Sequence, residues 1–366
     1  MRMKKCRATR VGLWVFLAGF AGASISSGTQ DPDMILGSPS VSSNALVFTL
    51  NAQSGVSYTI QASSNLLDWV AVGTNADPGI TRTITISNPP DGPSYYRAAR
   101  GPLPLFGFAL AAKGLITIAV GGVDSFDGSL GPWTPAMARA NATVLTDTNT
   151  AGAISLVAVG YIHGNAVTGP GGTVTVSGGS SVSGTITHDA NIEIHDVAAP
   201  TFSTFSTSLS GGTVNGTNYT YIATNGNYKL TNLNVSSGQS MVVNGNVVIY
   251  CTSVANNCVS VGGSGFIYIT PGSSLTLYIA GPSTITGVVN GSQPANTCII
   301  YGLPTCRAMG FSGGASFTGV LDAPEADVTL SGAAIWSGAV IVSSIYMSNN
   351  GGFHYDENLA RVGPTR

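Results

Sequence analysis

Histidines and carboxylates gather in one short segment near the middle of the chain. His188 and Asp189 are adjacent, and Glu193 and His195 follow shortly after them. Histidine titrates near neutral pH and binds metals, so a neighbouring carboxylate could support acid–base or metal chemistry. In a strand, alternate residues point to the same side, which would bring Glu193 and His195 onto one face. The competing interpretation is a solvated edge strand, which explains the same residues without any reaction.

A second pair of carboxylates, Asp124 and Asp127, flanks Ser125 and Phe126. Two carboxylates at this interval could hold Ca²⁺, although the spacing is not that of an EF-hand loop. A turn in which the carboxylates accept backbone N–H groups explains the same pattern and is the interpretation we favour. Asp124 and Asp127 therefore join the functional candidates as a second, separate group.

The distribution of charge argues against the reactions usual in β-helical enzymes. Polysaccharide hydrolases need two or three carboxylates that converge on one face, with one held as a general acid. Here the acidic residues fall in separate groups, and between residues 197 and 321 only Lys229 and Arg307 are charged. Residues 310–314 match a Gly-x-Ser-x-Gly elbow, but their flanks do not read as strand and helix. We expect no catalytic residue, no metal ligand and no cofactor.

The elements that would position these residues show a repeat. Phe317, Trp336 and Tyr355 lie 19 residues apart, and Gly319 and Gly338 keep the same interval. Short alternating apolar segments separate these marks. A period of about 20 residues built of short strands and turns is typical of a β-solenoid, in which each coil stacks on the next. We therefore predict an all-β fold whose main domain, residues 105–360, is a right-handed parallel β-helix.

The beginning of this domain is ambiguous from its sequence. Residues 106–120 are apolar apart from Lys113. They fit a short helix followed by a first strand, or a cap that covers the open end of the solenoid, because exposed end strands invite aggregation. Residues 197–218 are rich in Ser, Thr and Gly and are expected to form a loop or a lateral insertion.

The N-terminus resembles an export signal. A basic start is followed by an uncharged apolar run and by Ala21-Gly22-Ala23, so residues 1–23 are interpreted as a signal peptide. That segment contains five of the 14 Lys and Arg residues and none of the 16 Asp and Glu residues, which leaves a mature chain of formal net charge −7. Nucleic-acid binding needs a basic surface and is not expected. No second apolar run is long enough to span a membrane. We expect a secreted, extracellular or cell-surface protein, with the periplasm as the alternative location.

Four cysteines remain after the predicted cleavage site, namely Cys251, Cys258, Cys298 and Cys306. In an exported protein, disulfides are the default expectation. Four cysteines allow three pairings, and we favour Cys251–Cys258 with Cys298–Cys306 because each bond would close a short excursion between strands. Zinc sites need closer Cys spacing or nearby His residues, and this sequence has neither.

Residues 36–100 form a separate unit of short alternating strands divided by turn residues, which indicates a small β-sandwich. The stretch from Tyr58 to Trp69 and the later Tyr95-Tyr96-Arg97 resemble a small fibronectin-like module of exported bacterial proteins. The resemblance implies an accessory or spacer module without chemistry of its own.

The remainder of the chain, residues 105–360, is similar to an uncharacterised domain found in bacterial pilus-assembly proteins of the PilX type and in other exported proteins. The similarity rests on five segments in order, which are residues 123–129, 152–172, 319–326, 331–340 and 354–357. It implies a surface β-solenoid with no assigned catalytic residues.

Together these features predict an exported, non-enzymatic structural or adhesive protein, associated with the cell surface or with a pilus. Its expected partners are surface polysaccharides or proteins of the pilus or cell envelope. The alternative is a pectate-lyase-like β-helix that binds or cleaves polysaccharide. That alternative requires Asp189, Glu193 and His195 to converge with another carboxylate.

Overall fold

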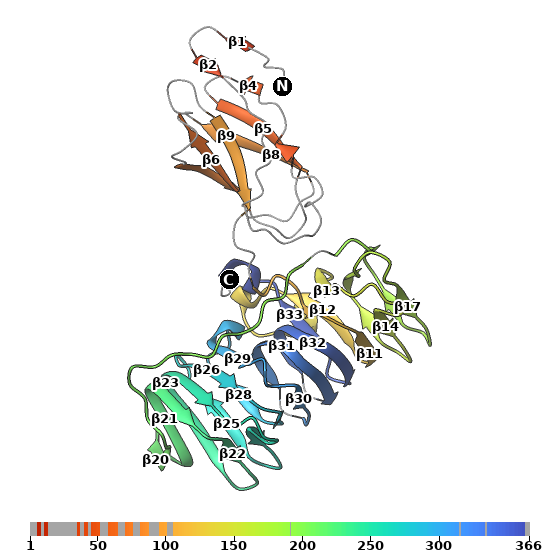
Figure 1. Cartoon of the computed structure of the whole chain (residues 1–366). Helices are drawn as coiled ribbons and strands as arrows, with labels where there is room; N and C mark the ends of the chain where they lie inside the picture. Colours follow the sequence, from red (N-terminus) through yellow and green to blue (C-terminus); the bar gives the residue numbers. More distant parts are fainter. Residues whose placement is uncertain are drawn as a thin grey trace. The chain divides into compact units, whose positions relative to one another are not determined.

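The computed structural model describes residues 105–362 except 191, 315 and 334, together with the strand segments that precede them. The chain divides into two compact units, one of Met1–Leu103 with the last two residues and one of Pro104–Pro364. Strands dominate the described residues of both units (Figure 1). The all-β prediction is therefore confirmed.

The first unit contains two antiparallel sheets that share one core. Leu46, Phe48 and Ile86 come from one sheet, and Ile60 and Tyr96 come from the other. The strands of the first sheet are β3 (Ile35–Leu36), β4 (Ser40–Ser42), β5 (Ala45–Asn51) and β8 (Thr81–Ser87), and those of the second are β6 (Tyr58–Ser63), β7 (Val70–Asn75) and β9 (Tyr95–Arg100). Within the predicted signal peptide, β1 (Cys6–Ala8) pairs with β2 (Val11–Leu13).

The second unit consists of one continuous sheet of 24 strands. We divide it into a first arm, β10–β19, and a second arm, β20–β33. The strands of the first arm are β10 (Leu110–Ala112), β11 (Ile116–Val120), β12 (Gly122–Phe126), β13 (Ala142–Thr146), β14 (Ile154–Leu156), β15 (Tyr161–Ile162), β16 (Gly164–Val167), β17 (Val174–Val176), β18 (Ser181–Val182) and β19 (Ile186–Thr187).

The strands of the second arm are β20 (Ser210–Val214), β21 (Thr217–Leu230), β22 (Leu233–Val235), β23 (Ser240–Cys251), β24 (Val259–Val261), β25 (Phe266–Ile269), β26 (Ser274–Ile279), β27 (Ser283–Ile285), β28 (Val288–Asn290), β29 (Cys298–Gly302), β30 (Ala308–Phe311), β31 (Phe317–Gly332), β32 (Trp336–Asn349) and β33 (Phe353–Asp356). The helix α1 (Leu359–Val362) follows, and three short 3-10 helices lie at Gly128–Leu130, Pro135–Met137 and Ala295–Thr297.

Strands that lie three places apart in the chain pair in parallel. In the first arm, β10 pairs with β13 and β13 with β16, while β11 pairs with β14 and β14 with β17. The second arm repeats the pattern, for example from β24 through β27 to β30. The single antiparallel pair among the described strands of this unit joins β20 to β21. Each pass of the chain therefore lies directly beside the previous one, with side chains in matching register.

The unit begins in the middle of this stack of strands. β10 and β11 pair with β32 on one side and with β13 and β14 on the other, and β12 likewise lies between β33 and β15. From there the first arm runs outward to β17–β19, and the second arm starts at the opposite end with β20 and returns to the middle (Figure 1). The strand expected within residues 106–120 is confirmed as β11, whereas the expected helix and the expected end cap are wrong. This segment neither contains a helix nor caps an end, because strands of the second arm cover its outer side.

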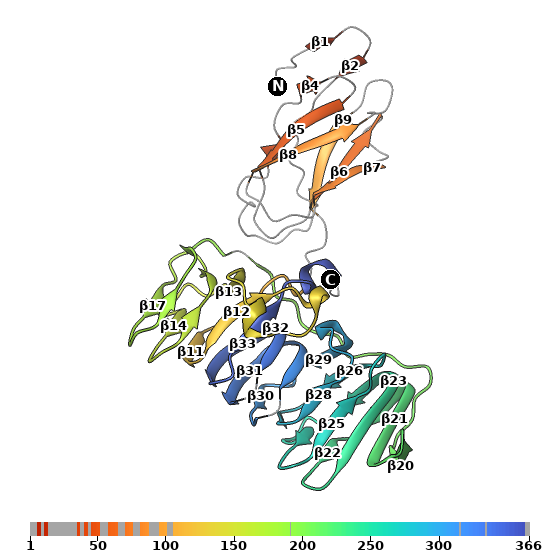
Figure 2. The ribbon, with the colours of Figure 1, turned by 180° about the vertical axis from the view of Figure 1, so that it is seen from behind.

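A connection without strands, residues 188–209, joins the two outer ends of the stack, and we name it the strap. Figures 1 and 2 show it running across the strands from β19 to β20. It starts where Ala190 N–H donates to Thr168 O, and it ends where Ser206 pairs with Tyr228. Between these points Val197 is buried against Ala280 and Leu303. The strap thus binds the two arms along one side.

Aromatic residues of the 19-residue repeat stack inside the second arm. Phe317 pairs with Trp336 in register, and their ring centroids lie 4.3 Å apart. The next ring in the stack is Phe353, which pairs with Trp336, whereas Tyr355 pairs with Gly338. The predicted stack is thus confirmed for Phe317 and Trp336 and wrong for Tyr355, because the last turn of the chain is two residues shorter than the period.

The repeated glycines Gly319 and Gly338 also have a physical reason. They face each other in register, and Gly338 has a φ of 145°. A Cβ atom at Gly338 would lie 1.8 Å from the carbonyl oxygen of Gly319. Only glycine allows the two strands to approach this closely.

Candidate functional site

A group of charged and hydrogen-bonding side chains lies where the two arms meet, and we name this junction the seam. It forms because β12 pairs in parallel with β33, which places Asp124 opposite His354 and Phe126 opposite Asp356. The turns that follow β12 and β33 add further charged residues to it. The two motifs that open and close the predicted solenoid are thus parts of one site.

The inner half of the seam is a buried histidine–aspartate pair. His354 Nδ1 lies 2.6 Å from Asp124 Oδ1, and the two side chains are only 4% and 6% exposed. His354 Nε2 lies 3.2 Å from the carbonyl oxygen of Gly351. The indole of Trp133 stacks on the imidazole with ring centroids 3.5 Å apart. Both imidazole nitrogens therefore face acceptors within the protein, and one face of the ring is covered.

The outer half of the seam is centred on Glu357. Its carboxylate accepts hydrogen bonds from Ser125 Oγ at 2.8 Å and from Asn141 Nδ2 at 3.0 Å, and it pairs with Arg139 Nη1 at 2.9 Å. These donors come from the first arm, whereas Glu357 follows the last strand of the second arm. The contacts therefore tie the two arms together.

Asp127 and Asp356 lie beside Glu357 and cap the turns around them. Asp127 Oδ1 accepts from Ser129 N–H at 3.1 Å and pairs with Arg361 Nη2 at 2.5 Å. The hydrogen bond from the Ser129 hydroxyl, with further help from Arg361, lowers the pKa of Asp127. Asp356 accepts from Gly128 N–H at 2.9 Å, and burial raises its pKa. The turn interpretation is confirmed for Asp127, while Asp124 instead bonds His354.

The four candidates between residues 188 and 195 lie on the strap and are spread along it. His188 Nδ1 lies 2.7 Å from Thr168 Oγ1. Glu193 and His195 are exposed, with 3.5 Å between Glu193 Oε1 and His195 Nδ1, and Asp189 is also exposed. The edge-strand interpretation is wrong in its strand, because the described residues of this segment form none, while Asp189, Glu193 and His195 are exposed as it expected. Among the described residues, no group of three or more His, Cys, Asp or Glu side chains is arranged to hold a metal ion.

An ion cluster that the sequence analysis missed fixes the strap to both arms. Lys113 Nζ lies 2.7 Å from Glu325 Oε1 and 3.2 Å from Asp196 Oδ1, and Arg307 also pairs with Glu325. The hydrogen bond from Lys113 lowers the pKa of Glu325. Desolvation of Lys113 opposes its charge, but its bonds to Glu325 and Asp196 outweigh that and raise its pKa. The signal in the sequence was the scarcity of cations, since Lys113 is one of only two lysines after residue 23.

The predicted disulfides are absent, and Cys251, Cys258, Cys298 and Cys306 are free and buried. Cys298 begins β29 and pairs with Leu275, whereas Cys306 lies beyond the other end of that strand and its thiol donates to Gly281 O at 3.2 Å. A five-residue strand spans about 13 Å. The Cα atoms of a disulfide lie within about 7 Å, so the strand separates these two thiols.

The thiols of Cys251 and Cys258 are neighbours but remain reduced. Cys258 Sγ donates to the carbonyl oxygen of Cys251 at 3.4 Å. The hydrogen bond from Cys251, together with backbone N–H groups of Gly281, Ala280 and Ser253, lowers the pKa of Cys258 to about 6. The sulfur of Cys258 is therefore held by hydrogen bonds at the end of β23.

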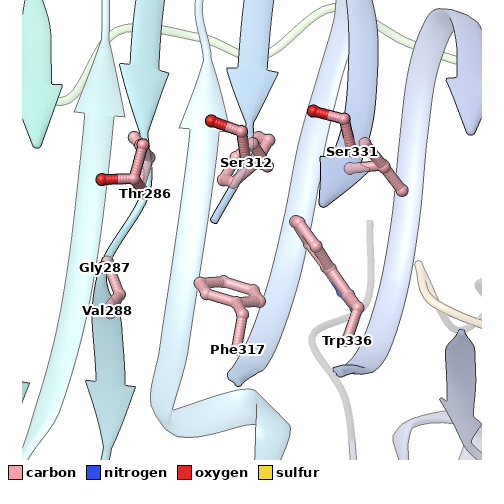
Figure 3. Close-up of a pocket in the computed structure, with 10 residues that line it drawn as sticks. Thr286, Gly287, Val288, Ser312, Phe317, Ser331 and Trp336 are labelled. Atoms are coloured by element: carbon pink, nitrogen blue, oxygen red, sulfur yellow. The ribbon is translucent and has the colours of Figure 1, made fainter. Parts of the chain in front are cut away.

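A small cavity lies beside the aromatic stack of the second arm (Figure 3). Phe317 and Trp336 line it on one side, and Thr286, Ser312 and Ser331 line it on another. Its volume is about 20 Å³, which is room for one water molecule. The indole nitrogen of Trp336 is buried and has no hydrogen-bond partner among the described residues. The cavity is far too small for a sugar ring.

Comparisons with known proteins place part of this chain in a recognised domain. A family model described as a domain of unknown function (DUF7305) matches residues 191–362, from the strap to α1. Neither the curated proteins nor the solved structures contain a match. The matched segment includes the whole second arm, whereas Asp124, Asp127 and the other first-arm residues of the seam lie outside it. In the part of the chain that the structure describes, no helix is long and apolar enough to cross a membrane.

Proposed function

We propose that this is an exported, non-enzymatic scaffold protein with a structural or adhesive role, whose Pro104–Pro364 unit is a right-handed parallel β-helix. Parallel pairing between strands three places apart supports a helical winding of three strands per coil. The strands also keep one direction across the seam, because β32 and β33 pair in parallel with β10–β12. The two arms then form one uninterrupted rod, and right-handed crossovers are the rule for parallel strands.

The main support for this proposal is that the charged groups at the seam bond to one another and to other protein groups. His354 and Asp124 are buried and bonded to each other, and Glu357 is bonded to three side chains of the first arm. A catalytic histidine needs a nitrogen within reach of substrate. The nitrogens of His354 face Asp124 and the Gly351 carbonyl instead. This arrangement of histidine and carboxylates is therefore suited to holding the arms together.

The outer surface would carry the contacts with partners. Few charged side chains interrupt the second arm, and outward positions such as Thr276 and Asn234 present hydroxyl and amide groups. A rigid surface of this composition suits repeated hydrogen bonds to a polysaccharide or to proteins of the pilus or cell envelope. The fibronectin-like first unit would act as a spacer, and the signal peptide would direct export.

The experiment is a paired assay of binding and cleavage. The purified exported chain is incubated with acidic and neutral polysaccharides, and bound protein and released reducing ends are measured in the same samples. We expect saturable binding to at least one polymer without release. Glu193→Gln removes the exposed carboxylate–histidine pair described above. If the natural chain releases reducing ends and this variant does not, the non-enzymatic proposal is overturned in favour of a polysaccharide-cleaving enzyme.

A second experiment tests where the protein is located in the cell. Protease added to intact cells should degrade a surface-displayed chain, while a cytoplasmic marker protein should survive. A chain that binds no polymer and stays protected inside intact cells would contradict an adhesive role at the cell surface.

A further inference from the structure

The two outer ends of the strand stack differ in how they cover the core. At the end formed by β20–β22, which we name the closed end, the inward residues Leu230, Leu233 and Val235 are buried. The β20 strand pairs with β21 there, and Ser206 of the strap continues the cover through hydrogen bonds with Asn227 and Lys229. The chain therefore caps its own closed end.

At the other end, formed by β17–β19, the core is left open, and we name it the open end. Val174, Val176, Val182 and Ile186 occupy the same register positions as the buried residues Ile154, Leu156, Ile162 and Ala166 of the preceding pass. Val176 is nevertheless 42% exposed and Ile186 43% exposed. Among the described strands, β17, β18 and β19 pair in register only with β14, β15 and β16 of the preceding pass. The exposed valine and isoleucine side chains and three strand edges thus lie at the same end of the stack, where Figures 1 and 2 show β17.

The open end also lacks the usual protection against pairing. Exposed strand edges in monomeric proteins carry Lys residues, bulges or covering segments that block the approach of another strand. From residue 148 to residue 187 the chain has no Asp, Glu, Lys or Arg, although the whole chain is net acidic. Two copies can therefore bring these ends together without the repulsion that other faces would cause.

We propose that the open end is a docking surface for the open end of a second copy of this chain. Stacking of an open end on a closed end is blocked, because β20 and Ser206 already occupy the edge of β21. A twofold contact between two open ends has no such obstacle, and it sets the facing strand edges antiparallel, an arrangement that forms regular β-ladders. Association closes at two copies, because β20 and Ser206 cover the edge of β21 at both outer ends of the dimer. The product is a rod of double length with a continuous core.

The test is the self-association of the full chain, measured by sedimentation at concentrations from about 1 to about 100 µM. We expect a monomer–dimer equilibrium. Val176→Lys should raise the dimer dissociation constant about 100-fold or more, because the twofold contact brings two like charges together. Val289→Lys is the matched control, since Val289 is also a strand valine that is 42% exposed but lies on β28, away from either end. This control should dimerise like the natural chain.

Two results would overturn the proposal. One is a natural chain that stays monomeric over the whole range, which would leave the open end to a different occupant. The other is an equal loss of dimer in Val289→Lys. Hydrogen exchange on the natural chain guards against a folding defect in Val176→Lys. Amide protection in residues 174–187 should rise with protein concentration, and protection that is independent of concentration would also count against the dimer.

Discussion

His354 Nδ1 and Asp124 Oδ1 lie 2.6 Å apart although the two residues are separated by 230 positions in the chain. This contact marks the point where the returning second arm meets the start of the first. Around it, Tyr355 donates its hydroxyl to the carbonyl of Phe106 at 2.9 Å, and Glu357 N–H donates to the carbonyl of Phe126. The last strand of the unit is thus bound to the beginning of the first arm by hydrogen bonds, and no covalent link crosses the described seam.

Removal of the buried aspartate should destabilise the fold strongly. Asp124→Ala leaves His354 without its partner in a buried site, and breaking such a pair costs about 3 kcal/mol of unfolding free energy or more. Asp189→Ala makes the same substitution at an exposed position of the strap and should cost less than about 0.5 kcal/mol. Urea denaturation followed by circular dichroism measures both variants. Equal losses in the two variants would show that the seam pair contributes little.

The ion cluster of Lys113, Glu325, Asp196 and Arg307 should make the free energy of unfolding depend on pH in the acid range. The bond from Lys113 lowers the pKa of Glu325 in the folded state, so this carboxylate stabilises the fold above its unfolded pKa of about 4.3. That contribution is lost as the pH falls through the lower folded value. Glu325→Gln should cost about 1 kcal/mol at pH 7, as expected for a partly exposed ion pair, and less at pH 3.

At each pH, the free energy of unfolding of Glu325→Gln is to be subtracted from that of the natural chain. Burial raises the pKa values of Asp356 and Asp147, and these groups change stability in the opposite direction. They are common to both proteins and cancel in the difference. A cost of Glu325→Gln that is the same at pH 3 and pH 7 would contradict the assignment.

The four buried cysteines should all be found as thiols. Protein unfolded in denaturant without reductant should take up one iodoacetamide at each of Cys251, Cys258, Cys298 and Cys306, as read by peptide mass spectrometry. In the folded protein, burial should slow the labelling of all four by about 100-fold or more, because the reagent reaches them only after local opening. A peptide pair joined through Cys251 and Cys258 would contradict the reduced state.

The position of the chain ends predicts that the second unit tolerates circular permutation. The permuted unit starts at residue 210 and continues to residue 362. A flexible linker of about ten residues then leads to residues 105–187. This order of segments keeps every strand pair. It lacks the strap, so we expect the same circular dichroism spectrum with a lower melting temperature. The control joins the same segments in the order 105–187 and 210–362 through an equally short linker. That linker cannot span the distance between the two outer ends of the stack. Failure of the permuted unit to fold, with the control folded, would contradict the strand order.

Local features of this fold were readable from the sequence because they depend on neighbouring residues. Alternating apolar residues such as those of β26 and β29 predicted short strands, and the interval between Phe317 and Trp336 predicted their stacking. The glycine pair Gly319 and Gly338 was visible for the same reason. The all-β class followed from these patterns.

The tertiary structure alone decided which passes of the chain lie side by side. A repeat specifies that consecutive passes stack, but each pass presents the same pattern on both edges, so the sequence does not reveal whether residues 105–126 end the stack or lie inside it. The pairing of β10–β12 with β32 and β33 fixes that order, together with contacts such as those of Asp124 with His354 and of Lys113 with Glu325. The free cysteines were missed for a related reason, because the path of β29 carries Cys298 away from Cys306. Short-range periodicity therefore determined the strands, and long-range contacts between unlike segments determined their arrangement and the candidate site.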